Sequence, residues 1–592
     1  MKTLTTIALA LMMMPLTVSA AKAKKKQTVK KITAIETVTK MNDEYQANHK
    51  PEVGTDAGNA AYFAANMEAY RLTGNARYLE YCDKWARHNK WNGPMEAYLD
   101  LYELNPDAYK IASVMSDENK SLPVLAKLYK ATRCKKYLER IIAEYRQADV
   151  FTLVRTLDAL PDDAPQRGDI ANRVKADVTA APTLYTLLWT VNRGLLDKAK
   201  YADIIEQMWS KRDNEPASIL AACEKVRYDD STLVSQRSLT VEVKNPTGTQ
   251  RQQVVELCAA DIFKRLGISG GRQFVVKNSI GNEIPSQLTH DGKILVEIAV
   301  APSSSATITI ATGLPKSYVN TCYGRMYPER VDDIAWENDR GAYRCYGPAL
   351  QASGEQAFGN DVWVKNTPDL VVESRYHNEL VNKLSYHVDR GYGLDCYKVG
   401  PTLGCGTPAI IEGDNIRFPY CWTAYEILDN GPLRFTVRLD YGANGEHRIM
   451  SLDKGSNFNK MTVWYDGISA PVDVASGVVI HTEDTESVVL GKDFVQYADP
   501  TDNPKNQNFQ IYVAAIFPDG VDVTRKVMYQ NPVRGNAGHA LGIKKGVQPG
   551  EKFTYYFGSA WSKYDCRTQA EWQQRIDTFK SALAMPLESI IK

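Results

Sequence analysis

Ionisable side chains are crowded into one segment of this sequence, from Arg330 to Gly406. The segment opens with RVDDIAWENDRGAYRCYGPALQ and closes with YHVDRGYGLDCYKVGPTLGCG. A packed strand alternates apolar and polar residues, whereas this segment interleaves acids, arginines and histidines with tyrosine, tryptophan and glycine. Polar and aromatic groups gathered around tight turns are what a sugar-sized cleft requires. We therefore expect the functional site in this segment.

One chemistry that these residues suit is β-elimination beside a uronate carboxylate. The reaction needs a base, a proton donor and a cationic clamp that neutralises the carboxylate. His387 or His377 is the candidate base, tyrosines are the candidate donors and arginines the candidate clamp. The predicted catalytic residues are Asp339, Arg340, Tyr343, Tyr346, His387, Asp389 and Tyr392. Pyranose rings stack on aromatic faces, and the predicted substrate-binding residues are Trp336, Arg344, Trp363, His377, Arg390, Asp395 and Tyr397.

Glycoside hydrolysis is the alternative chemistry. It requires two carboxylates, about 5 Å apart for retention or about 6.5–9.5 Å apart for inversion. Several pairs are available among Asp332, Asp333, Glu337, Asp339 and Asp395. A structural explanation also stays open, because the stretch from His387 to Arg390 has the pattern of an ordinary strand with a satisfied histidine and a surface ion pair.

No motif requires a cofactor, which stays unknown with a divalent cation as one option. Acidic runs such as VDDIAWENDR suit calcium, but the Asp/Asn/Gly spacing of a dedicated calcium loop is absent. His377, His387 and Asp389 are of types that ligate zinc, but ten residues separate the histidines and no HxxxH or HxH occurs.

The elements that position this segment differ between the two halves of the chain. From residue 35 to residue 224, apolar and aromatic residues recur at three- and four-residue steps, as in NAAYFAANMEAYRLTGNARYLEYCDKWARHN. The pattern Tyr70, Thr73, Tyr78 returns 59 positions later. Repeated helical hairpins bury their apolar faces by stacking on neighbours, which predicts an α/α toroid or solenoid. The length allows about eight to ten helices, so we expect an incomplete toroid.

From residue 225 to residue 592, strands replace helices. SLTVEVKN and KILVEIAVAPSSSATITIATG alternate apolar and polar residues, and turn signals such as Asn245-Pro246 and Asp291-Gly292 separate the strands. This half is predicted to be a large antiparallel β-sandwich of the supersandwich type, closed by a helix from Gln569 to Leu583. The expected fold class is therefore α + β and multidomain, with the toroid first and the sandwich second.

The first twenty residues have the pattern of a secretory signal. Lys2 supplies the positive region, an apolar run follows from Ile7 to Leu16, and Val18-Ser19-Ala20 fits a cleavage site. We expect a signal peptide at 1–20, a basic disordered leader at 21–34, and export across the inner membrane to the periplasm. Neither this run nor a later one is long enough to be a transmembrane segment, and no cysteine follows the expected cut to take a lipid anchor.

Overall charge and cysteine usage exclude two classes of protein. The 592 residues carry 71 basic and 70 acidic side chains, which argues against a nucleic-acid partner. Ten cysteines are spread thinly without the CxxC spacing of structural zinc sites. Cys345, Cys396 and Cys405 suit either a disulfide or free buried thiols.

The N-terminal half resembles glycoside hydrolase families 88 and 105, the unsaturated uronyl hydrolases. The resemblance rests on GNAAYFAANMEAYRLTGNARYLEYCDKWARHNKW, LPVLAKLYKATRCKKYLE, TLDALPDDAPQR and LYTLLWTVNRGLLDKAKY. It implies an (α/α)6 barrel, but the segment that carries the general-acid Asp of those hydrolases has no match, so no catalytic residue is transferred. Asp117, Glu118 and Asp149 lie near the gaps, where we expect them to cap or solvate helix ends. The half would then serve as a scaffold or as one wall of a cleft.

The C-terminal half resembles a bacterial family catalogued as domain of unknown function 4861. The matching motifs are YPERVDDIAWENDRGAYRCYGPALQ, FGNDVWVKN, SYHVDRGYGLDCYKVGPTLGCG and YYFGSAWSK. The resemblance implies carbohydrate work without an established catalytic residue. We therefore expect an exported carbohydrate-active protein whose partner is a uronate-containing oligosaccharide, with elimination in the sandwich domain. The alternatives are a glycoside hydrolase and a non-catalytic carbohydrate-binding protein.

Overall fold

The computed structural model describes residues 33–49, 56–88, 95–116, 120–229, 237–268, 270–502 and 508–592. The expected signal peptide at 1–20 lies outside the described residues, as does most of the expected leader at 21–34. Ala34 is the first residue of helix α1, and Ala34–Lys592 form one compact unit.

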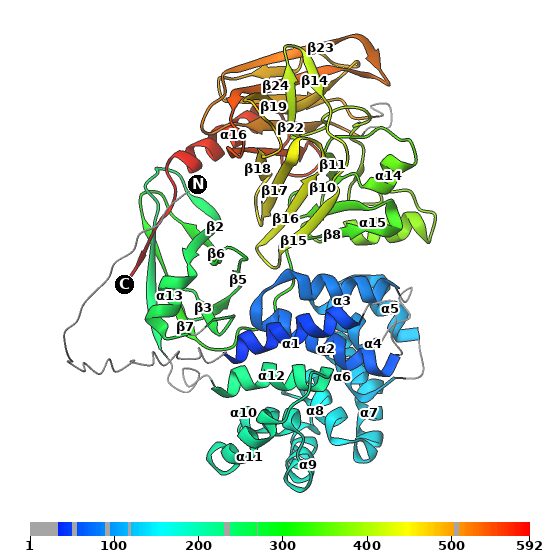
Figure 1. Ribbon diagram of the computed structural model, residues 1–592, viewed down its shortest axis with the longest axis vertical. Helices are drawn as coiled ribbons and strands as arrows, with labels where there is room; N and C mark the ends of the chain where they lie inside the picture. Colours follow the sequence, from blue (N-terminus) through cyan, green and yellow to red (C-terminus); the bar gives the residue numbers. More distant parts are fainter. Residues whose placement is uncertain are drawn as a thin grey trace, which may run out of the picture. The chain divides into compact units, whose positions relative to one another are not determined.

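Helices occupy the N-terminal part of the described chain (Figure 1). Twelve α-helices precede the first strand in the described residues, more than the eight to ten expected, because several are only nine or ten residues long. The helices are α1 (Ala34–Asn48), α2 (Asp56–Thr73), α3 (Ala76–His88), α4 (Met95–Leu104), α5 (Ala108–Ser116), α6 (Leu122–Thr132), α7 (Lys135–Glu144), α8 (Val150–Ala159), α9 (Arg167–Ala180), α10 (Leu184–Asn192), α11 (Lys198–Ser210) and α12 (Pro216–Asp229).

Local sequence signals account for the ends of these helices. The turn between α2 and α3 contains Gly74, whose φ of 73° is in the left-handed region that glycine adopts freely. Asp149 caps α8 by accepting a hydrogen bond from the backbone N–H of Thr152 at 2.9 Å, which confirms its expected capping role. Asp117 and Glu118 lie outside the described residues. The last helix of the region, α12, packs against α1, α2 and α10.

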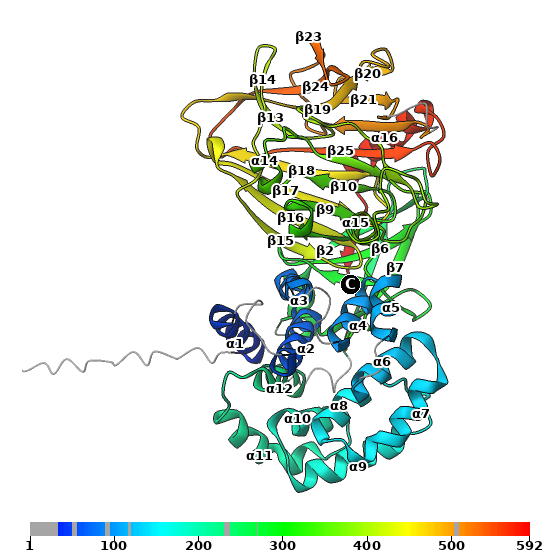
Figure 2. The same cartoon turned by 90° about the vertical axis from the view of Figure 1, so that its right-hand side faces the viewer.

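Two antiparallel sheets share the largest core of the C-terminal part (Figure 2). Along β17 every second residue is buried, which is the strand period expected where one face meets a core. The larger sheet has the order β15 (Ala424–Asn430), β16 (Arg434–Tyr441), β17 (Glu446–Asp453), β18 (Phe458–Tyr465), β25 (Phe553–Trp561), β22 (Ile511–Ile516), β21 (Phe494–Asp499) and β20 (Val488–Leu490). The smaller sheet has the order β14 (Asn415–Arg417), β13 (Ala409–Glu412), β19 (Val472–His481), β24 (Asn536–Val547) and β23 (Val523–Val533).

Two further sheets enclose a separate core together with α13 (Ala259–Leu266). One has the order β26 (Glu588–Ile591), β1 (Ser238–Lys244), β7 (Ser305–Thr312), β3 (Phe274–Lys277) and β4 (Glu283–Ile284), and the other β2 (Arg251–Cys258), β6 (Lys293–Val300) and β5 (Ser286–Leu288). The expected closing helix is present as α16 (Gln569–Ala584), and β26 after it returns to pair with β1.

Four strands from the segment between Arg330 and Gly406 form a further sheet with β8, and it packs into the core shared by the two large sheets. Its order is β12 (Leu394–Asp395), β11 (Asp361–Val364), β10 (Ala342–Cys345), β9 (Asp333–Glu337) and β8 (Tyr323–Tyr327). The same segment contributes α14 (Pro348–Ala352) and α15 (Val372–Leu380). The chain thus has a helical N-terminal region followed by antiparallel β-sheets. None of the helices in the described part has the length and hydropathy of a membrane span.

Candidate functional site

Arg344 stands among three buried carboxylates within the predicted segment. Its guanidinium lies 2.5 Å from Asp361, 3.0 Å from Asp395 and 3.7 Å from Asp333. Burial raises the pKa of Asp333 to about 6, although Arg344 opposes the shift. Burial, together with the charge of Asp361, raises the pKa of Asp395 to about 7. Such shifts mark candidate sites, but all three carboxylates are at most 2% exposed, so a sugar does not reach them in this conformation.

The predicted aromatic residues mostly fill the core. Trp336, Tyr343, Trp363 and Tyr397 are at most 4% exposed. The Tyr343 hydroxyl donates to the backbone carbonyl of Asn457 at 3.1 Å, and its ring stacks on Trp336. These side chains hold the sheet against its neighbours, which is the use a large sandwich makes of tyrosine and tryptophan.

Other predicted residues lie at the surface. The His387 side chain is 51% exposed, and its Nδ1 lies 3.0 Å from the backbone carbonyl oxygen of Asp395. Arg390 is exposed, whereas His377 and Tyr392 are partly exposed. Burial lowers the pKa of His377. In this arrangement neither histidine lies beside an arginine that could bind the carboxylate of a substrate uronate.

A single loop after β25 contacts two more of the predicted residues. Lys563 forms an ion pair with Asp389, and Asp565 lies 3.5 Å from Arg340. Asp339 is 3.9 Å from the same arginine. Arg340 and Asp389 are therefore connected through the loop, as parts of a surface network.

The predicted site residues do not line either of the two cavities described below. Tyr346, the last of them, is partly buried, with its hydroxyl 3.3 Å from Arg344. In the described residues, no three His, Cys, Asp or Glu side chains come together as metal ligands, so His377, His387 and Asp389 do not form the ligand set considered from the sequence. All ten cysteines are free thiols, which decides against a disulfide among Cys345, Cys396 and Cys405.

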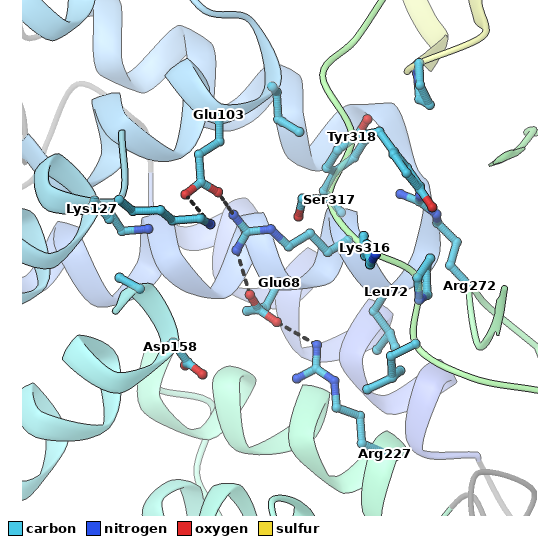
Figure 3. Close-up of a pocket in the computed structure, with 18 of the residues that line it drawn as sticks. Glu68, Leu72, Glu103, Lys127, Asp158, Arg227, Arg272, Lys316, Ser317 and Tyr318 are labelled. Atoms are coloured by element: carbon cyan, nitrogen blue, oxygen red, sulfur yellow. Dashed lines mark hydrogen bonds and ion pairs between the residues drawn. The ribbon is translucent and has the colours of Figure 1, made fainter. Parts of the chain in front are cut away.

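A cavity of about 380 Å³ lies between the helices and the loop that joins β7 to β8 (Figure 3). Its helical wall comes from α2, α4, α6, α8, α12 and Arg193, which follows α10, and its other wall from Arg272, residues 314–318, Asn320 and Pro432. Direct contacts hold the walls together. The Arg272 N–H donates to the Leu72 carbonyl at 2.7 Å, and the Tyr70 hydroxyl donates to the Asn430 carbonyl at 2.5 Å. Gly271 permits this approach, since a Cβ there would lie 2.9 Å from the Leu72 oxygen.

The helical wall carries a balanced network of ion pairs. Glu68 accepts from Arg71 and from Arg227, both at 2.7 Å (Figure 3). Burial alone would raise the pKa of Glu68, but the two arginines outweigh it and hold that pKa well below its usual range. The paired cations are Arg71, Lys127, Lys130, Arg155, Arg193 and Arg227, and their carboxylate partners are Glu68, Glu96, Asp100, Glu103, Asp158 and Glu224.

The opposite wall adds two cations that make no ion pair, and one carboxylate, Glu283, which accepts hydrogen bonds from the backbone N–H of Lys316 and from the Tyr318 hydroxyl. Arg272 and Lys316 line the cavity, and neither makes an ion pair with any residue that the structure describes. Burial lowers the pKa of Arg272, opposed only by the neighbouring phenols of Tyr70 and Tyr318. Six carboxylates balance the six paired cations, and Glu283 offsets only one of the two remaining cations, so the cavity keeps a net positive charge. The site is therefore suited to an anion.

Two further polar side chains reach the cavity from the same loop. The Tyr318 hydroxyl donates to Glu283, and burial, followed by this carboxylate, raises the pKa of Tyr318. Asn320 is 2% exposed, and neither polar atom of its amide has a partner with hydrogen-bond geometry in the described structure, although the amide lies beside the Tyr70 hydroxyl. An unsatisfied buried amide is costly, which makes Asn320 a candidate ligand-binding group.

The sequence patterns did not single out Arg272, Tyr318 or Asn320. Asp158 lies within the quoted TLDALPDDAPQR segment, but Tyr318 and Asn320 follow a strand in the unremarkable run LPKSYVN. The one available signal was a polar, tyrosine-bearing connection of several residues between two predicted strands. Its pairing with the helical wall depends on contacts across more than 200 residues of sequence, such as Asn320 N–H to Leu104 O at 2.7 Å.

The architecture is that of a helical region joined to antiparallel sheets with a cationic cavity where they meet. A family model described as "Domain of unknown function (DUF4861)" matches residues 243–588, more than half of the chain. The chain therefore belongs to this family, and the predicted resemblance of the C-terminal half is confirmed.

Individual relatives and solved structures share less than 30% sequence identity with this chain. The "Uncharacterized protein P7" of Formosa agariphila is 29% identical over 291 residues, which cover 46% of this chain and 70% of that protein. A glycosyl hydrolase family 88 structure from Bacteroides vulgatus is 22% identical, with 33% of this chain and 98% of that chain covered and a TM-score of 0.29. A protein in glycosyl hydrolase family 38 from Enterococcus faecalis is 10% identical, covering 86% and 62%, with a TM-score of 0.36. At such TM-scores the two structural likenesses do not establish a shared fold.

Proposed function

We propose that this protein is an exported, carbohydrate-active member of its family that binds a uronate-containing oligosaccharide in the cationic cavity and cleaves it by β-elimination. The observation that carries the proposal is the pairing of Arg272 with Asn320 at one cavity. One is a guanidinium without an ion-pair partner among the described residues, and the other is a buried amide beside the Tyr70 hydroxyl whose polar atoms make no hydrogen bond of good geometry. A sugar carboxylate satisfies both, because it accepts charge-assisted hydrogen bonds from a guanidinium and an amide N–H.

Tyr318 and Glu283 supply the proton transfer in this proposal. Neutralising the uronate carboxylate acidifies the adjacent C5–H bond, which is the role of Arg272 and Asn320. Tyr318 then takes the C5 proton while its own proton passes to Glu283. The C4–O bond breaks, a C4–C5 double bond forms, and the departing oxygen receives the proton back through Tyr318. The cycle leaves Tyr318 and Glu283 in their starting protonation states.

Hydrolysis is less well supported by the same geometry. An acid catalyst for glycoside cleavage needs a carboxyl group that is protonated near neutral pH. The carboxylates that line the cavity are Glu68, Glu103 and Asp158, and each is held by arginine or lysine. The pKa of Glu68 is depressed, which is opposite to what a general acid requires.

The proposal also includes a toroidal helical region, a supersandwich and a periplasmic location. The helical region is taken as an (α/α) toroid, supported by the twelve helices of the described chain before the first strand and by the packing of α12 against α1 and α2. In this proposal the toroid is small because several of its helices have only nine or ten residues, and not because helices are missing. The two large sheets are taken as a supersandwich. Export to the periplasm is supported by the signal-like first twenty residues.

The decisive experiment incubates the protein with a panel of uronate-containing oligosaccharides. Elimination produces a conjugated unsaturated uronate, which absorbs in the ultraviolet, with one new reducing end for each double bond. New reducing ends without absorbance would establish hydrolysis instead. Tight binding with neither product would leave a binding protein and end the catalytic proposal.

A further inference from the structure

A second and larger cavity, of about 1100 Å³, lies within the β-sheet region. It is enclosed by β2, by the ends of β17 and β18, and by the length of α16, which Figure 1 shows as the red helix between β2 and the large sheet. No helix of the N-terminal region contributes a lining residue. The two cavities are therefore separate sites.

The floor of this second cavity is a row of side chains across three neighbouring strands. Ser451 pairs in register with Lys460, and Lys460 pairs with Tyr556. The Tyr556 ring meets Phe579 of α16 edge to face, with centroids 5.0 Å apart, which holds the phenol in place. The hydroxyls of Ser451 and Tyr556 make no hydrogen bond, and Lys460 no ion pair, with any residue in the described ranges. These side chains therefore offer a ligand polar groups that are available for hydrogen bonding, next to an aromatic ring.

Charges around the second cavity are balanced, unlike those of the first. Arg434 pairs with Glu256 at 2.7 Å and with Asp453 at 2.5 Å. Lys454 pairs with Glu297, and Arg575 with Asp565, each at 2.5 Å. Arg251 and Lys460 make no ion pair with a described residue. The lining acids are Glu256, Asp453 and Asp577, and with the partner carboxylates Glu297 and Asp565, which do not line the cavity, five acidic groups match the five basic ones. No excess of charge selects an anion here.

The remaining polar lining combines amides with the hydroxyls of serine, threonine and tyrosine. A carboxamide both donates and accepts hydrogen bonds, which matches the hydroxyl groups of a sugar. Pyranose rings also stack on aromatic faces such as those of the floor. The volume is nearly three times that of the first cavity and exceeds the usual range for one small ligand. The glutamines that line it are Gln250, Gln252, Gln253, Gln573 and Gln574.

We infer that the second cavity binds uncharged sugar residues of an oligosaccharide, several at a time, as a site separate from the cationic cavity. This inference rests on the proposed carbohydrate function for the class of ligand, but not on the elimination chemistry. The two sites would bind charged and uncharged sugar residues of the same polysaccharide separately. Uronates enter the cavity at Arg272, and neutral sugars lie across Lys460 and Tyr556.

The test measures binding by titration calorimetry, with neutral hexasaccharides of glucose, xylose, mannose, galactose and rhamnose as the probes. At least one neutral probe is expected to bind, with an affinity that does not change between low and high salt. Tyr556→Phe removes only the hydroxyl and is expected to weaken binding by about three- to tenfold, the loss of one net hydrogen bond. Gln574→Ala should act in the same direction, whereas Gln207→Ala, an exposed glutamine of α11, should not change the affinity.

Failure of this inference is distinguishable from failure of the proposed function. If no neutral probe binds, or if binding is unaffected by both Tyr556→Phe and Gln574→Ala, the inference is overturned, whatever happens with uronates. If only anionic saccharides bind, and high salt abolishes that binding, the second cavity is likewise not a neutral-sugar site. If neutral probes bind as expected while Arg272→Ala leaves uronate binding intact, the inference stands and the cationic cavity loses its proposed role.

Discussion

The backbone N–H of Asn320 donates a hydrogen bond of 2.7 Å to the carbonyl oxygen of Leu104, at the last residue of α4. This contact fixes the loop between β7 and β8 on the helical region. It holds the Asn320 amide inside the cationic cavity, two residues from Tyr318. Arg272 and Asn320, the cavity groups proposed to bind the ligand, therefore come from the strand-bearing region. The helical region supplies the wall of ion pairs that they face.

Arg272→Ala is expected to weaken the binding of uronate oligosaccharides at least tenfold while leaving the protein folded. The guanidinium makes no ion pair in the described structure, so its removal leaves no carboxylate unpaired. Titration calorimetry measures the affinity and thermal unfolding measures the stability. Arg265→Ala is the matched control, because Arg265 is exposed and bonds only to the Ile591 carbonyl. Equal affinities for both variants would remove Arg272 from the site.

Tyr318→Phe is expected to lower kcat by about 10²–10⁴-fold with little change in KM, because the hydroxyl transfers the proton without holding the substrate carboxylate. Glu283→Gln should lower kcat in the same way, since Tyr318 then has no base to receive its proton. The readout is the ultraviolet absorbance of the unsaturated product. A rise in KM with kcat unchanged would show that Tyr318 only binds substrate.

Glu68→Gln is expected to destabilise the fold by about 3 kcal/mol at neutral pH, because Arg71 and Arg227 lose a shared carboxylate. The folded pKa of Glu68 lies below its ordinary 4.5. Its stabilising contribution is therefore present above that pH and is lost as pH falls through the folded pKa. Urea unfolding should show the gap between wild type and variant narrowing in acid. A constant gap would contradict the depressed pKa.

Asp395→Asn has the opposite dependence on pH. The pKa of Asp395 is raised to about 7 in the folded protein, by burial and by Asp361, against an ordinary 3.8. The proton bound in the fold therefore stabilises it at low pH, and this contribution is lost as pH rises from about 3.8 to about 7. The variant cannot ionise, so its stability relative to wild type should increase across that window. Urea unfolding at a series of pH values checks the slope, with Asp369→Asn as an exposed control.

His387→Ala and Arg340→Ala test the segment that the sequence favoured. If the cationic cavity is the site, both variants should keep turnover of uronate oligosaccharides within about twofold of wild type, since surface substitutions away from a site have small effects. The His387 side chain is half exposed and bonded to a backbone carbonyl, and Arg340 belongs to a surface network. Loss of turnover in folded protein would return the chemistry to the segment from Arg330 to Gly406.

Local sequence patterns were sufficient for a helical region followed by strands, the turn at Gly74, the cap at Asp149 and the helix near the C-terminus, but they missed α13, α14 and α15 among the strands. These features depend on residues a few positions apart, where spacing and capping chemistry act directly. The same local information revealed the ionisable segment from Arg330 to Gly406, and family motifs in it identified the family. The role of these charged side chains depends on tertiary contacts, which the local sequence does not contain.

Tertiary structure alone decided which charges are committed and which face a cavity. It closed Asp333, Asp361 and Asp395 around Arg344, out of reach of a ligand, and brought Arg272 and Asn320 against helices more than 150 residues earlier. An ionisable side chain is available for chemistry only when its neighbours leave it solvated or unpaired, and those neighbours are chosen by packing rather than by sequence proximity. The sequence therefore determined that charged and aromatic groups are abundant, and the fold determined which cations are left without an ion-pair partner.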